Sequence, residues 1–427
     1  MPANSPSTAA PVPTDQAIKP LAAFATAPAA ASPDAPLTLL GGLSAATFLR
    51  DYWQQRPLLI RQAIPGFQGL LDAAQLRTLA AQDQVQARLV VRDGRAWNLE
   101  HGPFARKRWK TLTATTPWTV LLQDLNIHLE QADALLRQFS FVPHARMDDL
   151  MVSHACRGGG VGPHFDSYDV FLLQGPGRRR WRISTQQDMS LRPGLPLRIL
   201  KNFRAEQDWV LAPGDMLYLP PRCAHEGVAL DDDCFTYSVG FRAPSPQAWV
   251  AEFLMDHAER LILEGQYTDP DPGVAAHPGQ LPAAMQAFLR KQLDVLHFDT
   301  SAIEDFNGRY LTEPKPNVVF GAPEAWLTPA AFRRQALRTG VRLDPRSRLL
   351  FSGDRAWCNG EAFALAPEER DCVIRLADAR ALSAAELSEG QRTDPAGWKR
   401  TLWPMLHQWQ EDGWLHFCPL LQRNGLL

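Results

Sequence analysis

The chain has 427 residues, enough for two or three domains, and 45% of them are hydrophobic, which is ordinary for a globular protein. The formal net charge of −2 argues against a protein whose main task is to coat nucleic acid, although it does not exclude a local basic patch. Six scattered cysteines without a CxxC pair indicate neither a cysteine zinc site nor a thioredoxin-like motif, and they favour a reducing compartment.

The first 37 residues are rich in Ala, Pro, Ser and Thr, and we expect residues 1–37 to form a disordered tail. They lack the basic start and unbroken apolar stretch of a signal peptide and the arginines of a transit peptide. No run of about 18 apolar residues occurs that could span a membrane. These features predict a cytoplasmic protein without membrane contact.

Short elements of mixed type are expected before residue 146. The predicted helices cover 44–53, 72–81, 116–128 and 130–139, and the predicted strands cover 85–93 and 96–100 around a Gly-containing turn.

The segment 146–245 differs, because short strand-like runs alternate with Gly/Pro clusters. The predicted strands cover 151–156, 168–174, 178–184, 208–211, 215–219, 226–230 and 234–241. The second and third flank Gly175-Pro-Gly177 and are expected to form a tight hairpin. Regularly spaced short strands with turn signals indicate a β-sandwich or barrel.

Helices are expected again from Ser245, which is a plausible N-cap. An apolar stripe then recurs every four residues at Trp249, Phe253, His257 and Leu261, with Gly265 as the predicted C-cap. Further helices are predicted near 282–297 and 301–311. A Pro-rich linker at 313–317 precedes a small α+β domain with a hairpin around 352–354.

Three residues are candidate metal ligands. Oxidation of an organic substrate by dioxygen needs a metal that has both protein ligands and vacant positions, and two histidines with one carboxylate on one face of an octahedron provide this. His164-Phe-Asp166 supplies two ligands, and residues i and i+2 of a strand point to the same side. His225 would supply the third from a second strand edge, just after Pro220-Pro221.

The same spacing occurs in His297-Phe-Asp299, at the end of a helical pattern. Residues two apart on a helix do not face each other and could not share one ion. We therefore interpret His297 as a histidine at a helix C-terminus, beside the macrodipole.

A second site is predicted in the strand Arg178–Ile183, where alternation places Arg179, Trp181 and Ile183 on the apolar, inner face. A guanidinium carried into a barrel is costly unless it is paired. A dicarboxylate such as 2-oxoglutarate would supply that pair, because guanidinium binds carboxylate bidentately. The alternatives are a buried salt bridge to an acidic residue and ordinary packing of an outer basic face.

Several long strings resemble the bacterial JmjC ribosomal oxygenases, specifically the family of arginine 3-hydroxylases that act on ribosomal large-subunit protein sixteen. They are residues 158–171, 173–182, 213–221, 225–227 and 237–244, with the shorter Tyr52–Pro57 and His101–Phe104 upstream. The likeness is strong over 38–265 and only architectural beyond.

The resemblance implies an α+β protein in four segments: the tail 1–37, a JmjC double-stranded β-helix domain (a cupin-like jelly roll) at 38–245, a helical dimerisation region at 246–312 and a winged-helix-like domain at 313–427. It implies Fe(II) at His164, Asp166 and His225, 2-oxoglutarate at Arg179, and O₂ as cosubstrate. Some family members carry a serine where this chain has Ala155, and Ser153 on the same strand face would substitute for it.

The implied reaction is hydroxylation of the β-carbon of an arginine in a ribosomal protein by a homodimeric enzyme. Tyr168 and Asp169, beside the metal strand, are candidate contacts for the guanidinium. Alternatively, Tyr168 packs in the barrel and Asp169 pairs with an arginine of the 178–182 strand.

Three rival functions stay open. A histidine hydroxylase or a demethylase would use the same iron chemistry, and a non-enzymatic cupin-type metal-binding or regulatory module would have no need of Arg179. A nucleic-acid-binding regulator would act through the C-terminal domain. Residues 328–427 hold 14 Lys/Arg against 12 Asp/Glu, however, which argues against direct nucleic-acid binding and favours a scaffold or partner-binding role.

Overall fold

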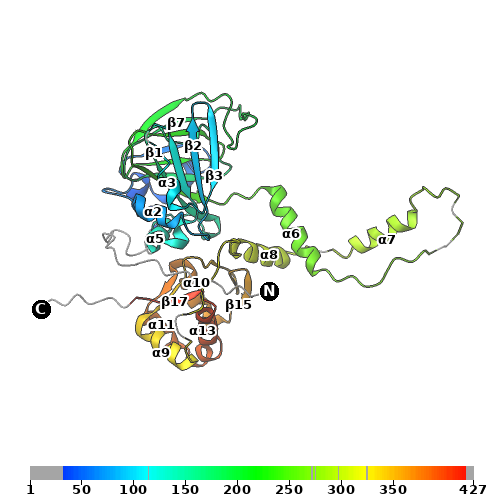
Figure 1. Ribbon diagram of the computed structural model, residues 1–427. Coiled ribbons are helices and arrows are strands. Elements are labelled where there is room, and N and C mark those ends of the chain that lie inside the picture. Colours follow the sequence, from blue (N-terminus) through cyan, green and yellow to red (C-terminus); the bar gives the residue numbers. More distant parts are fainter. Residues whose placement is uncertain are drawn as a thin grey trace, which may run out of the picture. The chain divides into compact units, whose positions relative to one another are not determined.

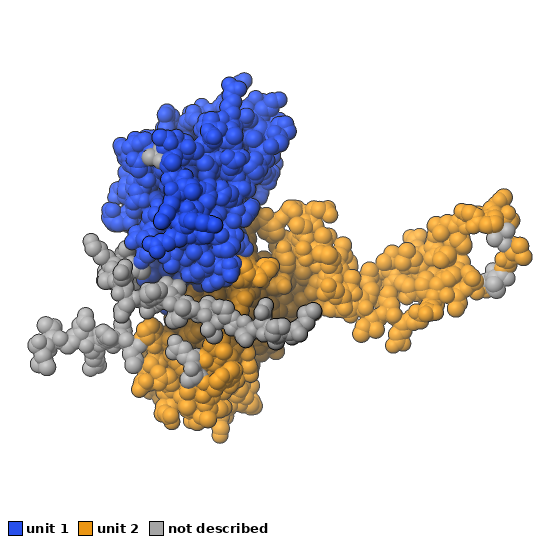
Figure 2. Space-filling view, in the orientation of Figure 1, with its two compact units in different colours: residues 1–143, 147–241 blue, residues 144–146, 242–427 orange. Residues whose placement is uncertain are grey.

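The computed structural model of the protein describes residues 32–113, 115–270, 273–274, 276–296, 298–323 and 326–419. The chain forms two compact units, which Figure 2 shows in separate colours. The first unit comprises 1–143 and 147–241, and the second comprises 144–146 and 242–427. Within the described ranges, no helix is both long and apolar enough to cross a membrane.

A large antiparallel sheet is the frame of the first unit (Figure 1). In the described residues it has eight strands in the spatial order β1-β9-β6-β11-β5-β4-β2-β3. These strands are β1 (Leu58–Ile60), β2 (Ala87–Asp93), β3 (Ala96–His101), β4 (Trp118–Leu122), β5 (Met147–Ala155), β6 (Val170–Gln174), β9 (Met216–Leu219) and β11 (Cys234–Phe241). Most neighbours are far apart in sequence, as the jelly-roll prediction requires.

A smaller antiparallel sheet has the order β10-β7-β8, with β7 (Arg179–Ser184), β8 (Gln207–Leu211) and β10 (Ala224–Ala229). An inner apolar cluster joins the two sheets, because Val170 and Leu172 of β6 pack with Trp181 and Ile183 of β7. The two sheets therefore enclose one interior, which confirms the predicted double-stranded β-helix.

Helices cover the outer face of the large sheet. They are α1 (Ala45–Asp51), α2 (Ala73–Leu79), α3 (Arg106–Trp109), α4 (Leu125–His128) and α5 (Glu130–Arg137), with the short turn η2 (Thr38–Leu40) in addition. The short turn η3 (His144–Arg146) belongs to the second unit. The outer core joins Phe48 of α1 and Leu135 of α5 to Phe171 and Tyr218 of the sheet. Since both faces of β6, β9 and β11 are covered, every residue of these strands is buried.

Two of the predicted helices begin at caps. The Ser44 side chain accepts a hydrogen bond from the Thr47 backbone N–H at the start of α1. Asp72 and Gln75 form a reciprocal capping box at the start of α2. Both helices therefore begin where the sequence predicted.

The helix predicted over 116–128 is wrong. The segment forms strand β4 followed by the single turn α4. β4 pairs with β2 on one side and β5 on the other, and all five of its residues are buried. The β-branched Thr119 and Val120 suit this central position, and pairing on both sides overrides the apolar run that favoured a helix.

The hairpin predicted around 175–177 is also wrong. β6 pairs with β9 and β11 in the large sheet, whereas β7 pairs with β8 and β10 in the small one. Gly175-Pro-Gly177 therefore carries the chain from one sheet to the other. Gly177 has φ +72°, and a Cβ there would lie 2.6 Å from the Asp233 carbonyl oxygen.

The predicted tail extends too far along the chain. Residues 1–31 lie outside the described ranges, but the segment from 32 to 37 is held by backbone hydrogen bonds. The Ala46 N–H donates to the Pro33 carbonyl at 3.0 Å, and the Leu37 N–H donates to the Leu43 carbonyl at 3.0 Å. Structure therefore begins several residues before the predicted boundary at 37.

The second unit combines helices with two small antiparallel sheets of described residues, β16-β12-β17 and β13-β14-β15. Its helices are α6 (Pro246–Arg260), α7 (Ala283–Leu293), α8 (Thr300–Thr312), α9 (Pro329–Thr339), α10 (Pro367–Ala379), α11 (Ala384–Thr393), α12 (Pro395–Gly397), η4 (Trp398–Leu402) and α13 (Trp403–Glu411). Its strands are β12 (Val341–Leu343), β13 (Leu349–Ser352), β14 (Arg355–Cys358), β15 (Glu361–Ala364), β16 (Ala381–Leu382) and β17 (Leu415–Phe417). The predicted hairpin around 352–354 joins β13 to β14.

Helix α8 packs on this hairpin. Asp305 accepts hydrogen bonds from Arg355 at 2.8 Å and from the indole N–H of Trp357 at 3.2 Å. A Cβ at Gly308 would lie 2.0 Å from the Trp357 ring, so only glycine allows this approach. α8 is thus tied to the α+β part of the second unit.

Helix α6 ends earlier than predicted, because the chain is extended at Leu261, before Gly265. Phe253 of the predicted stripe packs on α8 and on the segment before it: its ring lies 5.2 Å from Phe306 and 5.1 Å from Phe298 between centroids. Of the second HxD pair, His297 lies outside the described residues, and Asp299 is the N-cap of α8.

A buried polar network behind β6 yields a stability prediction. The Tyr218 hydroxyl donates to the fully buried Asp169 at 2.7 Å and accepts from the Gln54 backbone N–H at 2.7 Å. We expect Tyr218→Phe to lower the free energy of unfolding by about 1–3 kcal/mol, because buried polar groups lose a partner. Urea denaturation followed by tryptophan fluorescence measures this difference.

Tyr52→Phe is the matched control, because the Tyr52 hydroxyl makes no hydrogen bond to a described residue. Its stability should stay within about 0.5 kcal/mol of the wild type. Equal stability of both variants would show that the network contributes nothing.

Candidate functional site

His164, Asp166 and His225 converge in the interior of the first unit. Each offers one ligand atom, and the three atoms lie within 4.8 Å of one another. His225 Nε2 lies 3.7 Å from Asp166 Oδ2, and the two imidazole rings are 4.2 Å apart between centroids. Two imidazoles and one carboxylate at this spacing can ligate a single divalent ion.

Hydrogen bonds to the backbone fix the tautomer of both histidines. Nδ1 of His164 lies 2.9 Å from the Gly162 carbonyl, and Nδ1 of His225 lies 2.9 Å from the Cys223 carbonyl. A carbonyl only accepts, so each Nδ1 carries the proton and each Nε2 keeps a lone pair. Burial and the neighbouring His164 lower the pKa of His225, which keeps its imidazole neutral and able to bind a cation.

One antiparallel bridge aligns the two histidines. His164 N–H donates to the His225 carbonyl at 2.9 Å, and His225 N–H donates to the His164 carbonyl at 2.8 Å. His164 therefore lies in an isolated bridge and not at the start of a regular strand, which corrects the prediction. The Arg222 N–H holds Asp166 by donating to its carbonyl at 2.7 Å.

The cluster opens into a cavity of about 370 Å³ between the two sheets. Arg179 lines it and is only 3% exposed. Its Nε and one terminal nitrogen are buried without a hydrogen-bond partner among the described residues. The predicted inward cation is therefore present, and the predicted alternative of a buried salt bridge to an acidic residue is not found in the described part of the chain.

The other arginines of this strand face outward, where each has an acidic partner. Arg178 pairs with Asp231 at 3.0 Å, Arg180 pairs with Asp208, and Arg182 pairs with Glu226. Arg179 thus differs from its neighbours in facing the cavity and in lacking a carboxylate. An unpaired buried guanidinium beside a cation site fits a bound dicarboxylate.

Ser153 and Ala155 lie on the inner side of β5. Ser153 is buried and lines the cavity, whereas Ala155 packs with Ala229 and Cys234. Ser153 therefore presents its hydroxyl at the cavity, as its predicted role in place of a serine at position 155 requires. The register of β11 on β5 places Thr236 opposite Ser153.

Sequence reasoning missed several cavity residues. The hydroxyls of Thr119, Thr236 and Ser238, together with Met151, also line the cavity. Strand alternation in β4, β5 and β11 would have found them, but Thr119 was hidden by the incorrect helix prediction.

Gly227 permits a close contact beside His225. A Cβ there would lie 2.6 Å from the Trp181 ring, which crosses from the opposite strand. Glycine in the His225-Glu-Gly227 string therefore leaves room for the indole beneath the ligand histidine.

Tyr168 lies at the cavity and is 38% exposed. Burial of its hydroxyl and the nearby carboxylates Asp166, Asp149 and Asp148 raise the pKa of Tyr168. An aromatic ring among carboxylates is a suitable surface for a cation. Tyr168 is thus partly accessible and not fully packed into the barrel.

The prediction that Asp169 contacts substrate is wrong. Asp169 is fully buried on the opposite side of the chain from Tyr168, where it accepts from Tyr218 and from the Gln54 side chain at 3.1 Å. The arginines at 178, 180 and 182, its predicted alternative partners, pair with other acids. Adjacent residues of an extended segment point to opposite faces, which separates Asp169 from the cavity.

Two family models match the chain. The JmjC domain model matches residues 134–249, and the ROXA-like winged helix model matches residues 295–416. The first contains the whole metal-ligand cluster, and the second covers most of the α+β part of the second unit.

The chain is similar to two curated bacterial proteins over most of their length. It is 36% identical over 319 residues to the ribosomal protein uL16 3-hydroxylase of Escherichia coli, covering 74% of this chain and 84% of that protein. It is 33% identical over 402 residues to a probable ribosomal oxygenase of Haemophilus influenzae, covering 86% and 94%.

A solved structure has the same fold. YcfD, a ribosomal oxygenase from Escherichia coli in complex with cobalt and 2-oxoglutarate, is 31% identical with a TM-score of 0.71 and covers 87% of this chain and 97% of that one. The identities and coverage are high enough to assign a family. The chain belongs to the ribosomal oxygenases of the JmjC type, which are iron- and 2-oxoglutarate-dependent dioxygenases.

Proposed function

We propose that the protein hydroxylates the β-carbon of an arginine side chain in a ribosomal large-subunit protein, the counterpart of uL16. The main support is the buried, unpaired guanidinium of Arg179, which faces the same cavity as the cluster of His164, Asp166 and His225. Similarity to a uL16 3-hydroxylase supports the choice of substrate.

In this proposal the three clustered side chains hold Fe(II), and Arg179 binds the distal carboxylate of 2-oxoglutarate, with Ser153 as a further hydrogen-bond partner. Iron with 2-oxoglutarate and dioxygen supplies the oxidation, in which one oxygen atom enters a C–H bond and the cosubstrate becomes succinate and carbon dioxide. A non-enzymatic cupin-type module would leave the cost of burying Arg179 unexplained.

The remaining residues of the site would position the substrate and exclude water. Tyr168 would lie against the substrate guanidinium at the cavity mouth, where nearby carboxylates favour a cation. Hydroxyls and apolar side chains around Met151 and Thr236 would seat its aliphatic part. This arrangement holds the target carbon near the metal, which is the contribution a protein makes to cofactor chemistry.

We propose that the segments 38–245, 246–312 and 313–427 are also functional divisions, and that 246–312 mediates a homodimer. Helices α6 and α7 support this, because they expose Val250, Leu254, Met255, Phe288 and Leu289. The winged-helix-like domain would act as a scaffold. Six free cysteines support a cytoplasmic location.

The substrate is tested by mass spectrometry of ribosomal large-subunit proteins incubated with enzyme, Fe(II) and 2-oxoglutarate. We expect a gain of one oxygen atom on an arginine. In His164→Ala the rate of this modification should fall by more than the roughly 10–100-fold that is typical when a residue that only supports a metal ligand is changed. His277→Ala, an exposed histidine, is the control and should keep full activity.

The same spectra separate the rivals. Oxygen on a histidine, or loss of a methyl group, would replace the arginine assignment with a histidine hydroxylase or a demethylase. Turnover of 2-oxoglutarate without any modified ribosomal protein would contradict the substrate class.

The role of Arg179 is tested by Arg179→Met. We expect the apparent affinity for 2-oxoglutarate to fall by about 10–150-fold, the equivalent of one charge-assisted hydrogen bond. Without cosubstrate, the variant should unfold at a higher temperature than the wild type, because a buried unpaired charge is removed. Steady-state kinetics and thermal unfolding measure the two effects.

Arg180→Met is the matched control, because Arg180 lies on the outer face of the same strand and pairs with Asp208. It should leave the affinity for 2-oxoglutarate unchanged. Equal kinetic effects of the two substitutions would reject Arg179 as the carboxylate partner.

The dimer is tested by Leu254→Glu, which places a charge on the exposed apolar face of α6. Because a charge is costly to bury at an interface, we expect the variant to sediment as a monomer in analytical ultracentrifugation. Ala330→Glu adds the same charge to an exposed position on α9, outside the proposed dimerisation region, and should leave the dimer intact. A wild-type protein that sediments as a monomer would contradict the proposal.

A further inference from the structure

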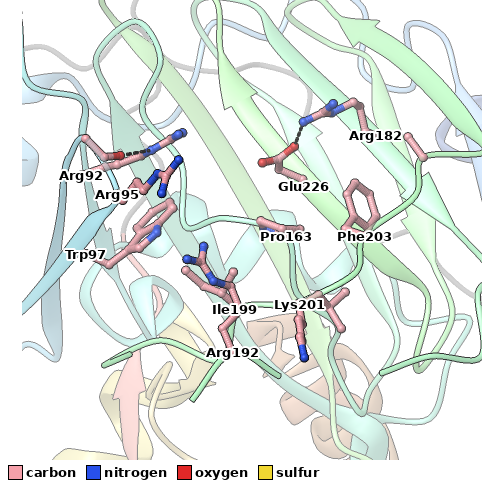
Figure 3. A pocket seen from close by; sticks show the side chains of 13 residues that line it. Arg92, Arg95, Trp97, Pro163, Arg182, Arg192, Ile199, Lys201, Phe203 and Glu226 are labelled. Carbon is pink, nitrogen blue, oxygen red and sulfur yellow. Dashed lines mark hydrogen bonds and ion pairs between the residues drawn. The ribbon is translucent and has the colours of Figure 1, made fainter. Parts of the chain in front are cut away.

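A second cavity in the first unit has no role in the proposed reaction. It is a cleft of about 360 Å³, and Figure 3 shows that cationic side chains gather around it. We define this basic cleft by its charged and aromatic lining residues, which are Arg92, Arg95, Trp97, Arg182, Arg192, Lys201, Phe203 and Glu226. It contains five cations and one acid.

Four of these cations are held in no ion pair with a described residue, although Asp188, whose pKa is lowered by hydrogen bonds from Ser190 and Asn202, also feels the charge of Lys201. Arg182 pairs with Glu226, but Arg92, Arg95, Arg192 and Lys201 form no ion pair with any described residue. All four are exposed. Like charges gathered around one cleft repel each other and concentrate a positive potential there, and a bound polyanion would relieve this repulsion.

Two aromatic rings lie among the cations. Trp97 and Phe203 are half-buried, and the Arg92 guanidinium is 5.4 Å from the Trp97 ring centroid. Cations that follow a groove and aromatic faces on which bases stack are the two components of sites for single-stranded nucleic acid. Arginine suits this task, because its planar fork matches phosphate oxygens.

The basic cleft is next to the oxygenase cavity in the chain as well as in space. Pro163 lines the cleft and directly precedes His164. The segment 196–198 lines the oxygenase cavity, and the following residues, 199–201, line the cleft. A ligand in the cleft would therefore contact segments that continue into the lining of the oxygenase cavity.

We propose that the basic cleft binds the phosphate backbone of single-stranded RNA. The choice of RNA over an acidic peptide rests on the proposed function, because a ribosomal protein substrate is accompanied by RNA. The rings of Trp97 and Phe203 support the same choice, since bases stack on aromatic faces and an acidic peptide has no such need. The near balance of charges in residues 328–427 led us to expect no direct nucleic-acid binding, but the basic cleft lies in the first unit, and the chain's net charge of −2 left a local basic patch open.

The test measures binding of a fluorescein-labelled oligouridine of roughly 16 nucleotides to the full chain by fluorescence polarisation. We expect a dissociation constant between about 1 and 100 µM. The logarithm of the association constant should fall with the logarithm of the salt concentration with a slope near −3, since each of four phosphate contacts on a single strand contributes about 0.7. In Arg95→Glu/Arg192→Glu, affinity should fall at least tenfold and the slope should fall to about −1.

The matched control is Arg333→Glu/Arg334→Glu, which reverses two exposed arginines on α9 of the winged-helix-like domain. Its affinity for RNA should stay within twofold of the wild type. The variant of the basic cleft should keep wild-type turnover of 2-oxoglutarate, which shows that it is folded and separates this test from that of the proposed function.

Three results would overturn the inference. One is no binding at about 100 µM protein in low salt, where even non-specific binding is expected. Another is equal loss of affinity in both charge-reversed variants. The third is displacement of RNA by polyglutamate at a lower concentration than by unlabelled oligouridine, which would identify an acidic protein as the ligand.

Discussion

The single antiparallel bridge between His164 and His225 is the constraint on which the site depends. Its two backbone hydrogen bonds hold the segment after the glycine-rich loop against β10, and Asp166 is held by the Arg222 N–H. The carbonyls of Gly162 and Cys223 then set the tautomer of each ring. The arrangement of the three proposed ligands is therefore built from main-chain contacts, which tolerate little movement, before any ion binds.

The two faces of the large sheet have different roles in forming the site. Its outer face packs aromatic and aliphatic side chains against α1, α2 and α5, which makes the strands rigid. Its inner face carries the hydroxyls of Ser153 and Thr236 toward a cavity opposite Arg179. One interior thus combines an apolar cluster with a cation that no described residue pairs, and in the proposed function a dicarboxylate ligand offsets the cost of burying that cation.

Most elements and the inward placement of Arg179 followed from local patterns. Alternation along 178–183 placed Arg179 inward, and caps at Ser44 and Asp72 marked helix starts. The errors have a common cause. The run at 116–128 is apolar enough for a helix or a strand, and pairing with β2 and β5 makes its first part the strand β4. Gly175-Pro-Gly177 has the composition of a hairpin turn, but the strands on either side of it pair in different sheets.

The sequence alone thus determined which side chains have the chemistry of a metal site and of a carboxylate partner. It could do so because residue types, their spacing and their alternation along a strand are local properties of the chain. Only the tertiary structure decided which of them meet. It placed Asp169 away from the cavity, where it bonds to Tyr218, and packed Phe253 against α8. It also brought the β2–β3 hairpin and the segment between β7 and β8 together, so that four cations without an ion pair to a described residue line one cleft. Contacts between distant segments depend on strand pairing and packing, which short stretches of sequence do not encode.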